Sequence, residues 1–395
     1  MEQTLSYVIV TPHSISKSRT GGVIARLLSQ TDLELVGAQM ITPDENFTRD
    51  YAACIRSQNI RNLNSAGELL ANYIESKMSP SGGRKHRFLL LIFRGENPCR
   101  KLSQICGKLF QKDNSNEDII YGETVRDTYA DYIVDNDDHN KVIYFEPAIL
   151  TPRSQELADE NLAIFARHFK NIDNIVCNMT YPDPSKIERT LVILKPDNWK
   201  HASGRPGTII DMFSRTGLRI VGIKLFSFSL NQALDFYGPV EFALKDKLSP
   251  IFGQKAKEIL EKHFSISLSE ATGKSLGETF GKEYAGEEFN KIIEFMSGRQ
   301  PNTCPPEEAD KPGGVKCMIL IYEGVNAVQK IREVLGPTDP LKAPGGTVRR
   351  EFGSNVMVNT AHASDSVESY EREKDIVRVD ENPLISIIDA YLIGR

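Results

Sequence analysis

His362 is the residue whose sequence surroundings best suit phosphoryl chemistry. A neutral imidazole has an available lone pair near pH 7, so it could attack a phosphorus atom without a separate base. Three cations and two neutral hydrogen-bonding side chains stand after the predicted strands or in the loops beside them: Lys195, Arg332, Arg349, Thr338 and Asn359. In phosphoryl transfer the protein mainly aligns the reacting groups and neutralises the charge of the phosphates. The set therefore predicts a polyphosphate site with His362 as nucleophile.

The elements that must position these residues alternate between strands and helices. Residues 190–194 form a short apolar run, a helix is expected to run from Pro206 to about residue 216, and residues 219–226 alternate as a strand. Apolar residues at helical spacing predict a helix closed by Gly298. The pattern continues with a strand at 315–322, a helix at 327–334, a last strand at 356–359 and a helix from about 365 to 373. We expect Asn359 and His362 to follow that last strand.

The same pattern occurs twice in the chain. Residues 5–39 and 189–224 each contain an apolar strand, a proline, a glycine-led helix and a second strand with Val-Gly. Further along, RFLLLIFRGEN corresponds to KCMILIYEGVN, and GETVRDTY corresponds to GGTVRREF. Gly37 and Gly222 are 185 residues apart, whereas Gly107 and Gly336 are 229 apart, so the second copy has a net gain of 44 residues. This repetition predicts two domains of one fold.

Each copy is expected to be an α/β (α+β) domain with the ferredoxin-like order β-α-β-β-α-β and an antiparallel four-stranded sheet. We place the first domain at 1–173, a proline-containing linker at 174–187 and the second domain at 188–395. The added residues of the second copy are expected around 242–286 and 299–312.

The first copy lacks most of the residues that suggest chemistry. Thr11 stands in place of Lys195, Ser103 stands in place of Arg332, and the expected fourth strand at 140–150 has no histidine. Only Arg126 survives of the three cations. We therefore expect a non-catalytic first copy that packs against the second as an intramolecular pseudo-dimer, because both sheets have a free face to cover.

The stretch NTAHASDSVES at 359–369 resembles the active-site signature of nucleoside-diphosphate kinases, Asn-x-x-His-(Gly/Ala)-Ser-Asp. Segments at 188–197, 218–224, 331–340 and 344–352 match other parts of that family in the same order. The family moves the terminal phosphate of a nucleoside triphosphate to an enzyme histidine and then to a nucleoside diphosphate. The resemblance therefore implies ATP as phosphate donor, with Mg²⁺ bound through the nucleotide phosphates.

The resemblance also implies a role for each matched residue. His362 would be the phosphorylated nucleophile, Glu373 its orienting partner, and Ser364 a hydrogen-bonding group near the transferred phosphate. The residues implied to contact phosphates and ribose are Lys195, Arg332, Thr338, Arg349 and Asn359. Tyr237 matches an aromatic beside the phosphates, and Phe289 or Phe252 could stack on the base. Core packing is the alternative reading of these aromatics.

Composition narrows the remaining possibilities. A chain of 395 residues with 40% hydrophobic and 26% charged residues suits two or three globular domains. A net charge of −5 argues against general nucleic-acid binding. The histidines lack metal-ligand spacing, the cysteines form no C-x-x-C pair, and neither a signal segment nor an apolar run of roughly 18 residues is present. We expect a cytoplasmic protein without membrane contact, as a single chain or a homo-oligomer. A non-catalytic nucleotide-binding or scaffold protein of the same fold is the alternative to the enzyme.

Overall fold

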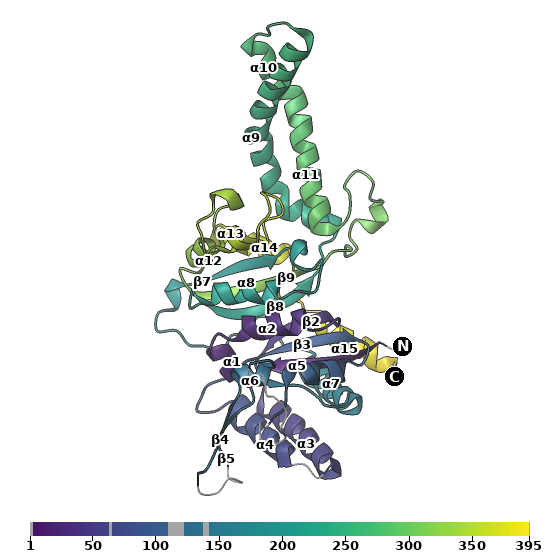
Figure 1. Cartoon of the computed structure of the whole chain (residues 1–395), viewed down its shortest axis with the longest axis vertical. Helices are drawn as coiled ribbons and strands as arrows, with labels where there is room; N and C mark the ends of the chain where they lie inside the picture. Colours follow the sequence, from purple (N-terminus) through teal and green to yellow (C-terminus); the bar gives the residue numbers. More distant parts are fainter. Residues whose placement is uncertain (1–2, 63–64, 110–121, 137–141, 395) are drawn as a thin grey trace. The chain divides into compact units, whose positions relative to one another are not determined.

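The computed structural model describes residues 3–62, 65–109, 122–136 and 142–394. The chain divides into two compact units (Figure 1). The two-sheet unit comprises Met1–Leu225, Met318–Glu371 and Arg378–Arg395, and it holds both copies of the sheet. The helical unit comprises Phe226–Cys317 and Arg372–Val377.

The first four-stranded sheet has the strand order β2-β3-β1-β6. Its strands and the two helices that connect them are β1 Thr4–Val10, α2 Thr20–Ser29, β2 Glu34–Ile41, β3 Phe88–Gly95, α5 Pro98–Cys106 and β6 Ile149–Leu150. Every residue of β1 is buried, because β1 is a central strand paired antiparallel with both β3 and β6. The other elements of this copy are α1 Pro12–Ser16, α3 Glu45–Asn62, α4 Ser65–Tyr73, η1 Ile74–Met78, α6 Val125–Tyr129, β4 Asp131–Val134, β5 Val142–Glu146 and α7 Gln155–Phe169.

The second sheet repeats this topology in the order β10-β7-β9-β8. Its strands and connecting helices are β7 Ile187–Leu194, α8 Arg205–Ser214, β8 Arg219–Phe226, β9 Cys317–Val325, α12 Ala327–Leu335 and β10 Ala361–Ala363. The other elements of this copy outside the added residues are η2 Pro184–Lys186, η3 Pro196–Asn198, η6 Pro340–Lys342, α13 Val348–Phe352 and α14 Val367–Ile376. In both sheets the first and third strands are central and antiparallel, which confirms the predicted ferredoxin-like fold.

The fourth strand of each copy differs from its prediction. In the second copy the strand is Ala361–Ala363 instead of 356–359, so His362 lies within it, opposite Ile193. The side chain of Asn355 accepts hydrogen bonds from the backbone N–H groups of Met357 and Val358 and closes a turn where a strand was expected.

In the first copy only Ile149–Leu150 joins the sheet, whereas 140–150 was predicted. β5 pairs instead with β4 in a separate two-stranded hairpin, and residues 140 and 141 lie outside the described chain. Ala148, between β5 and β6, has a φ of 60°, so the chain cannot continue as one extended strand.

The two copies contact each other through helices α2 and α8 (Figure 1). The contact is made by backbone, because a methyl group on Gly21 would lie 2.5 Å from the carbonyl oxygen of Gly207. Asn382 adds a second connection, since its side-chain amide donates to Ala38 O in β2 at 2.9 Å and to Ile223 O in β8 at 3.2 Å. The two copies therefore pack together within the two-sheet unit, and helices α2 and α8 make this contact, where the sequence predicted the free faces of the sheets.

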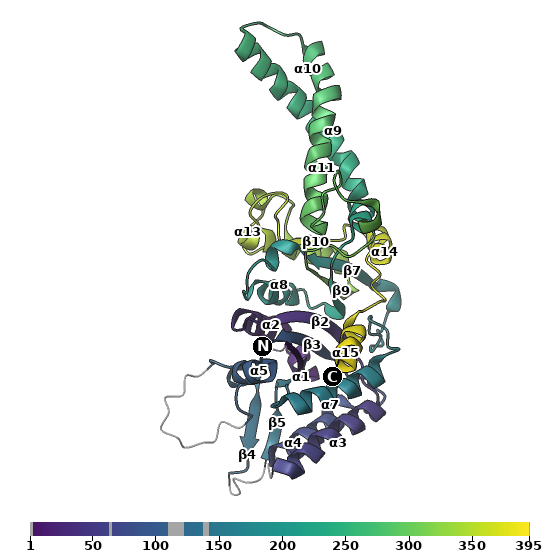
Figure 2. The same cartoon turned by 90° about the vertical axis from the view of Figure 1, so that its right-hand side faces the viewer.

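The last helix, α15 Leu384–Ile393, completes the core of the first copy although it follows the second copy in sequence. It packs beside α7 (Figure 2), and Leu384 and Ile388 are fully buried among the apolar residues of the first sheet. The segment expected to be a linker is also fixed in place, since the Asn174 side chain donates to Val379 O at 2.7 Å. Residues from the two ends of the chain thus share one core.

The helical unit contains the added residues of the second copy. Its main elements are α9 Leu230–Phe264, α10 Glu270–Leu276, η4 Gly277–Gly281, α11 Lys282–Ser297 and η5 Pro306–Glu308. A capping box of Ser229 and Gln232 starts α9, and Gly298 in the left-handed conformation ends α11 where the sequence predicted. A methyl group on Gly253 would lie 2.4 Å from the backbone nitrogen of Gly277, so the helices meet at their glycines.

None of the helices in the described chain is long and apolar enough to cross a lipid bilayer.

Candidate functional site

His362 is half-buried in the middle of β10, the outer strand next to β7. The buried residues Ala361 and Ala363 flank it, as the alternation of a strand requires. The guanidinium of Arg349 donates to Ala361 O at 3.0 Å through Nη2 and to Gly336 O at 2.9 Å through Nη1. Arg349 therefore joins the loop after α12 to the strand that carries the histidine.

A chain of hydrogen bonds connects three more of the predicted residues. Lys195, at the end of β7 and only 8% exposed, donates from Nζ to Asn359 Oδ1 at 2.7 Å. The amide nitrogen of buried Asn359 donates to Thr338 O at 3.1 Å and to Val356 O at 2.7 Å. Lys195, Asn359 and Thr338 thus come together from three segments beside the histidine strand.

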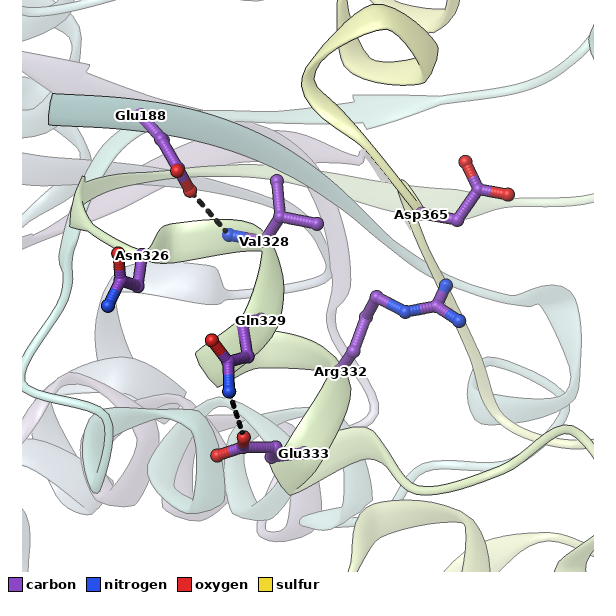
Figure 3. A pocket seen from close by; sticks show the side chains of 7 residues that line it. All are labelled: Glu188, Asn326, Val328, Gln329, Arg332, Glu333 and Asp365. Carbon is purple, nitrogen blue, oxygen red and sulfur yellow. Dashed lines mark hydrogen bonds between the residues drawn. The ribbon is translucent and has the colours of Figure 1, made fainter. Parts of the chain in front are cut away.

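Arg332 lies on the exposed side of α12, with its guanidinium extended toward Asp365 (Figure 3). A hydrogen bond from Ser369 lowers the pKa of the Asp365 carboxyl, and the nearby charges of Arg332 and His362 act in the same direction. Asp365 follows His362 by three residues, so Arg332 lies beside the segment that follows the histidine strand (Figure 3). Ionised Asp365 also begins the turn that leads into α14.

A pocket of about 480 Å³ lies beside Arg332 and Asp365; Figure 3 shows the side chains that line it. It is lined by Glu188, Asn326, Val328, Gln329, Arg332, Glu333 and Asp365. Within it, Glu188 accepts a hydrogen bond from the backbone N–H of Val328 at 3.4 Å, at the start of α12. Three carboxylates face one guanidinium there, which disfavours a polyphosphate inside this pocket. The cation-bearing strand ends are the better place for phosphate.

Ser364 is fully buried and extends the pairing of β10 with β7. Its backbone N–H donates to Leu191 O at 3.1 Å, and its hydroxyl oxygen accepts from Leu191 N at 3.3 Å. The structure therefore gives Ser364 a part in fixing the register of the histidine strand.

The other predicted residues lie in the helical unit. Tyr237 and Phe289 are 6% and 4% exposed, and the Tyr237 ring packs on Phe236 with centroids 5.0 Å apart. Phe252 packs on Tyr284 at 3.8 Å. Glu373 is buried on α14, in the part of that helix that belongs to the helical unit. The implied roles of Glu373 and of the aromatics in binding nucleotide stay predictions.

A partly buried ion pair that the sequence prediction missed lies beside this cluster. Arg205, at the start of α8, donates from Nη2 to Asp197 Oδ2 at 2.7 Å, to Phe352 O at 2.7 Å and to Thr360 Oγ1. The carbonyl of Thr360 accepts from Lys195 N at 3.0 Å and from Asn198 Nδ2 at 2.7 Å. The one available sequence signal was an arginine at the start of the first helix in both copies, Arg19 and Arg205.

The first copy retains the framework of this region. Val10 pairs with Ile149 as Leu194 pairs with Ala361, so Ile149 corresponds to Ala361. Arg126 donates to Gly107 O at 2.5 Å and to Ile149 O at 3.2 Å, which are the counterparts of both Arg349 bonds. Its burial lowers the pKa of Arg126. The arginine common to both copies therefore has a structural function in each.

The same register identifies what the first copy has lost. Leu150 stands opposite Ile9 as His362 stands opposite Ile193, so a leucine takes the place of the histidine. By the same count Pro147 replaces Asn359, and Thr11 replaces Lys195. The imidazole, the ammonium and the amide are absent together, while the backbone that holds them is kept.

In the described part of the chain, no group of three or more His, Cys, Asp or Glu side chains is arranged to hold a metal ion. The side chains around His362 are mainly cations and amides, which are poor ligands for Mg²⁺ and good partners for phosphate oxygens.

Comparison with known proteins assigns this arrangement to a family. The model of the family described as "Nucleoside diphosphate kinase" matches residues 188–257 and 249–381, both in the second copy. The nucleoside diphosphate kinase of Thermosipho africanus is 31% identical over 206 residues, which are 52% of this chain and 96% of that protein. The one from Anaeromyxobacter dehalogenans is 32% identical over 183 residues, 46% of this chain and 83% of that protein.

Two solved structures are similar at 25% sequence identity, and each match covers 48% of this chain and 94% of the other. They are the nucleoside diphosphate kinase of Aquifex aeolicus, with a TM-score of 0.29, and an NDP kinase from Pyrobaculum aerophilum, with a TM-score of 0.32. The match to the Thermosipho protein spans nearly its whole length. The residues matched by the family model include the histidine strand and its cation-bearing neighbours. The chain belongs to the nucleoside diphosphate kinase family.

Proposed function

We propose that the second copy transfers the terminal phosphate of a nucleoside triphosphate to His362 and then to a nucleoside diphosphate. The observation that carries this proposal is the position of His362 on β10, between the Arg349 bond to Ala361 and the hydrogen-bonded chain of Lys195 and Asn359. A half-buried imidazole beside two fixed cations can approach a phosphorus whose oxygens those cations neutralise.

The two half-reactions balance at this histidine. A ring nitrogen of neutral His362 attacks the terminal phosphorus, so an N–P bond forms while the P–O bond to the bridging oxygen breaks. The bridging oxygen leaves with the electron pair as part of the first nucleoside diphosphate. A terminal oxygen of a second nucleoside diphosphate then attacks the same phosphorus, the N–P bond breaks, and the imidazole regains its lone pair.

The substrate in this proposal is the magnesium–nucleotide complex, with ATP as donor. Mg²⁺ would enter on the phosphate oxygens and spread their charge, since the residues around His362 offer hydrogen-bond donors in place of metal ligands. Lys195, Arg332 and Arg349 would complete the neutralisation, and Thr338 and Asn359 would orient the bound phosphates and ribose. Ser364 and Glu373 would fix the strand and the imidazole.

The first copy, residues 1–173 in our division, is proposed to be a non-catalytic partner of the catalytic copy at 188–395. Leu150 and Thr11 support this. Leucine has no nucleophilic atom to replace the imidazole, and threonine has no positive charge to neutralise a phosphate. The contact of α2 with α8 supports a packing role for the first copy.

Incubation of the whole chain with γ-labelled ATP tests the proposal. We expect one acid-labile, base-stable label per chain, its loss in His362→Gln, and its retention in the matched variant His201→Gln, since His201 is an exposed loop histidine of the same copy. Label on the wild type should move to added nucleoside diphosphate. Absence of label on folded wild-type protein would instead support the non-catalytic nucleotide-binding or scaffold function.

A further inference from the structure

Thr360, two residues before His362, has a backbone conformation that a β-branched residue rarely adopts. Its φ is 76°, in the left-handed region, where the side chain crowds the backbone. Such a conformation is energetically unfavourable and persists only when neighbouring groups hold it. Because β10 begins at the next residue, the conformation of Thr360 sets the direction in which the histidine strand leaves the loop.

Arg205 and Asp197 hold Thr360 from one side. Nη2 of Arg205 donates to the Thr360 hydroxyl and to Asp197 Oδ2, and the same hydroxyl lies 3.5 Å from that carboxylate oxygen. The Asp197 side chain is 4% exposed and that of Arg205 is 26% exposed. Because the carboxylate is almost completely shielded from water, its charge-assisted hydrogen bond from the partly exposed guanidinium is strong and directional. It therefore couples the start of α8 to the residue that leads into β10.

Comparison of Arg205 with Arg19, its counterpart in the first copy, distinguishes the contacts found in both copies from those found only in the copy that has the histidine. Arg19 donates to Tyr129 O at 2.6 Å and lies 5.7 Å from the centroid of the Tyr129 ring. Arg205 repeats both contacts with Phe352, at 2.7 Å and 5.7 Å. The two arginines therefore share one structural contact.

The remaining contacts of Arg205 have no counterpart. In the first copy His13 occupies the position of Asp197, and Ala148, with a φ of 60°, occupies that of Thr360. A carboxylate and a hydroxyl at these positions occur only in the copy that also has the histidine. Ala148 is not β-branched, so it adopts a positive φ with less crowding than Thr360 does. The contacts of Asp197 and Arg205 are thus found only where a threonine has to be held in that conformation, beside the histidine strand.

We propose that Asp197 and Arg205 are positioning residues that act through Thr360 to set the aim of the His362 imidazole at the terminal phosphorus. This inference rests on the proposed phosphotransferase function. Neither residue is expected to touch the nucleotide. Their effect should therefore fall on the rate of phosphoryl transfer and leave nucleotide affinity nearly unchanged, since a misplacement of about 1 Å can lower a rate roughly 100-fold.

The test compares Arg205→Gln with the matched variant Arg19→Gln. Each loses one guanidinium contact to a backbone carbonyl and an aromatic ring, but only Arg205→Gln also loses Asp197 and Thr360. We measure the single-turnover rate of labelling by γ-labelled ATP and, separately, the dissociation constant of ADP. Arg205→Gln should label roughly 10- to 100-fold more slowly with ADP affinity changed less than about threefold, and Arg19→Gln should label at the wild-type rate.

Two further variants keep the result interpretable if Arg205→Gln folds poorly. Arg205→Lys keeps the charge beside Asp197 but lacks the planar fork that reaches several partners, so it should fold and still label more slowly. Thr360→Gly should restore part of the rate in the Arg205→Gln background, because glycine adopts a positive φ without being held. A merely structural role for Arg205 predicts no such rescue.

The outcomes separate the inference from the function on which it rests. An unlabelled, folded wild type removes the proposed function itself. Two results with a labelled wild type would remove the positioning inference and leave the proposed function intact. In the first, Arg205→Gln and Arg205→Lys label at the wild-type rate. In the second, Arg205→Gln and Arg19→Gln are slowed equally. A loss of ADP affinity that matches the loss of rate would also overturn it, because Arg205 would then act in binding.

Discussion

Replacing Gly207 by alanine would place a methyl group inside the contact between α8 and α2. A methyl carbon at this position would lie 2.2 Å from the backbone nitrogen of Ala25 and 2.3 Å from the carbonyl oxygen of Gly21. Both obstacles are backbone atoms of a helix, so they cannot turn aside as a side chain could. This substitution therefore tests whether the two copies unfold as one cooperative unit.

The size of the effect follows from these distances. Ordinary contacts of such a carbon begin near 3.4 Å, so α8 would have to retreat by about 1.2 Å at this point. Overpacking typically destabilises a protein by about 1–3 kcal/mol, and alanine regains at most about 1 kcal/mol of helix propensity. With a backbone obstacle the upper end applies, so we expect a net loss of about 2 kcal/mol.

Thermal unfolding followed by circular dichroism checks this value. At roughly 2 °C per kcal/mol for a unit of this size, Gly207→Ala should lower the Tm by about 4 °C. Gly345→Ala is the matched control in the same unit, because no atom lies within 4 Å of its added carbon and Tm should hardly change. Gly21→Ala should behave like Gly207→Ala, since its carbon would lie 2.4 Å from Asp211 N. Equal melting of Gly207→Ala and Gly345→Ala would refute a close packing of the two copies.

Three further predictions concern stability. Burial lowers the pKa of Lys224, which donates to Arg378 O and Glu381 O, to about 8, whereas the unfolded chain keeps this proton up to about pH 10.5. The free energy of unfolding should therefore rise with pH between these values, by up to about 3 kcal/mol relative to Lys224→Met. Urea titrations of both proteins at pH 8 and pH 10 measure this difference. A parallel response of the two proteins would contradict this. Arg126→Met should lower the free energy of unfolding by about 2–3 kcal/mol, because it leaves two carbonyl groups of the first copy without their hydrogen-bond donor. The labelling of His362 should stay unchanged, and slower labelling would show that the first copy takes part in transfer. Gly253→Ala should weaken hydrogen-exchange protection in α9, since its carbon would lie 2.4 Å from Gly277 N; unchanged protection would contradict the close helix contact.

Elements whose signals are local in sequence were predicted closely. The strand at 219–226 has the observed bounds, and the helix ending at Gly298 was placed because glycine at a helix end has a direct backbone cause. The repeat likewise predicted two sheets of one topology, since each copy carries its own periodicity. Within the two-sheet unit, Lys195, Asn359 and Thr338 form one hydrogen-bonded chain from three separate segments, and their role in binding phosphate stays a prediction.

Predictions were wrong where a local turn or an unusual backbone conformation interrupted a strand. The Asn355 turn moved the fourth strand of the second copy to Ala361–Ala363, although residues 356–359 are apolar enough to suggest a strand. In the first copy Ala148 separated β5 from β6, so a segment of continuous strand character was divided between a hairpin and the sheet. Hydrophobic periodicity reports burial of a face and carries no information on such local hydrogen bonds.

The sequence by itself determined the repeat, the family signature and the identity of the chemical groups, because these depend on residue types and on spacings of a few positions. Only the tertiary structure decided that Arg205 reaches Thr360, 155 residues away, and that α15 packs in the core of the first copy. It also decided that α2 and α8 meet at their glycines. These contacts join segments distant in the chain, and their energy depends on distance and burial in the folded protein, which residue spacing does not record.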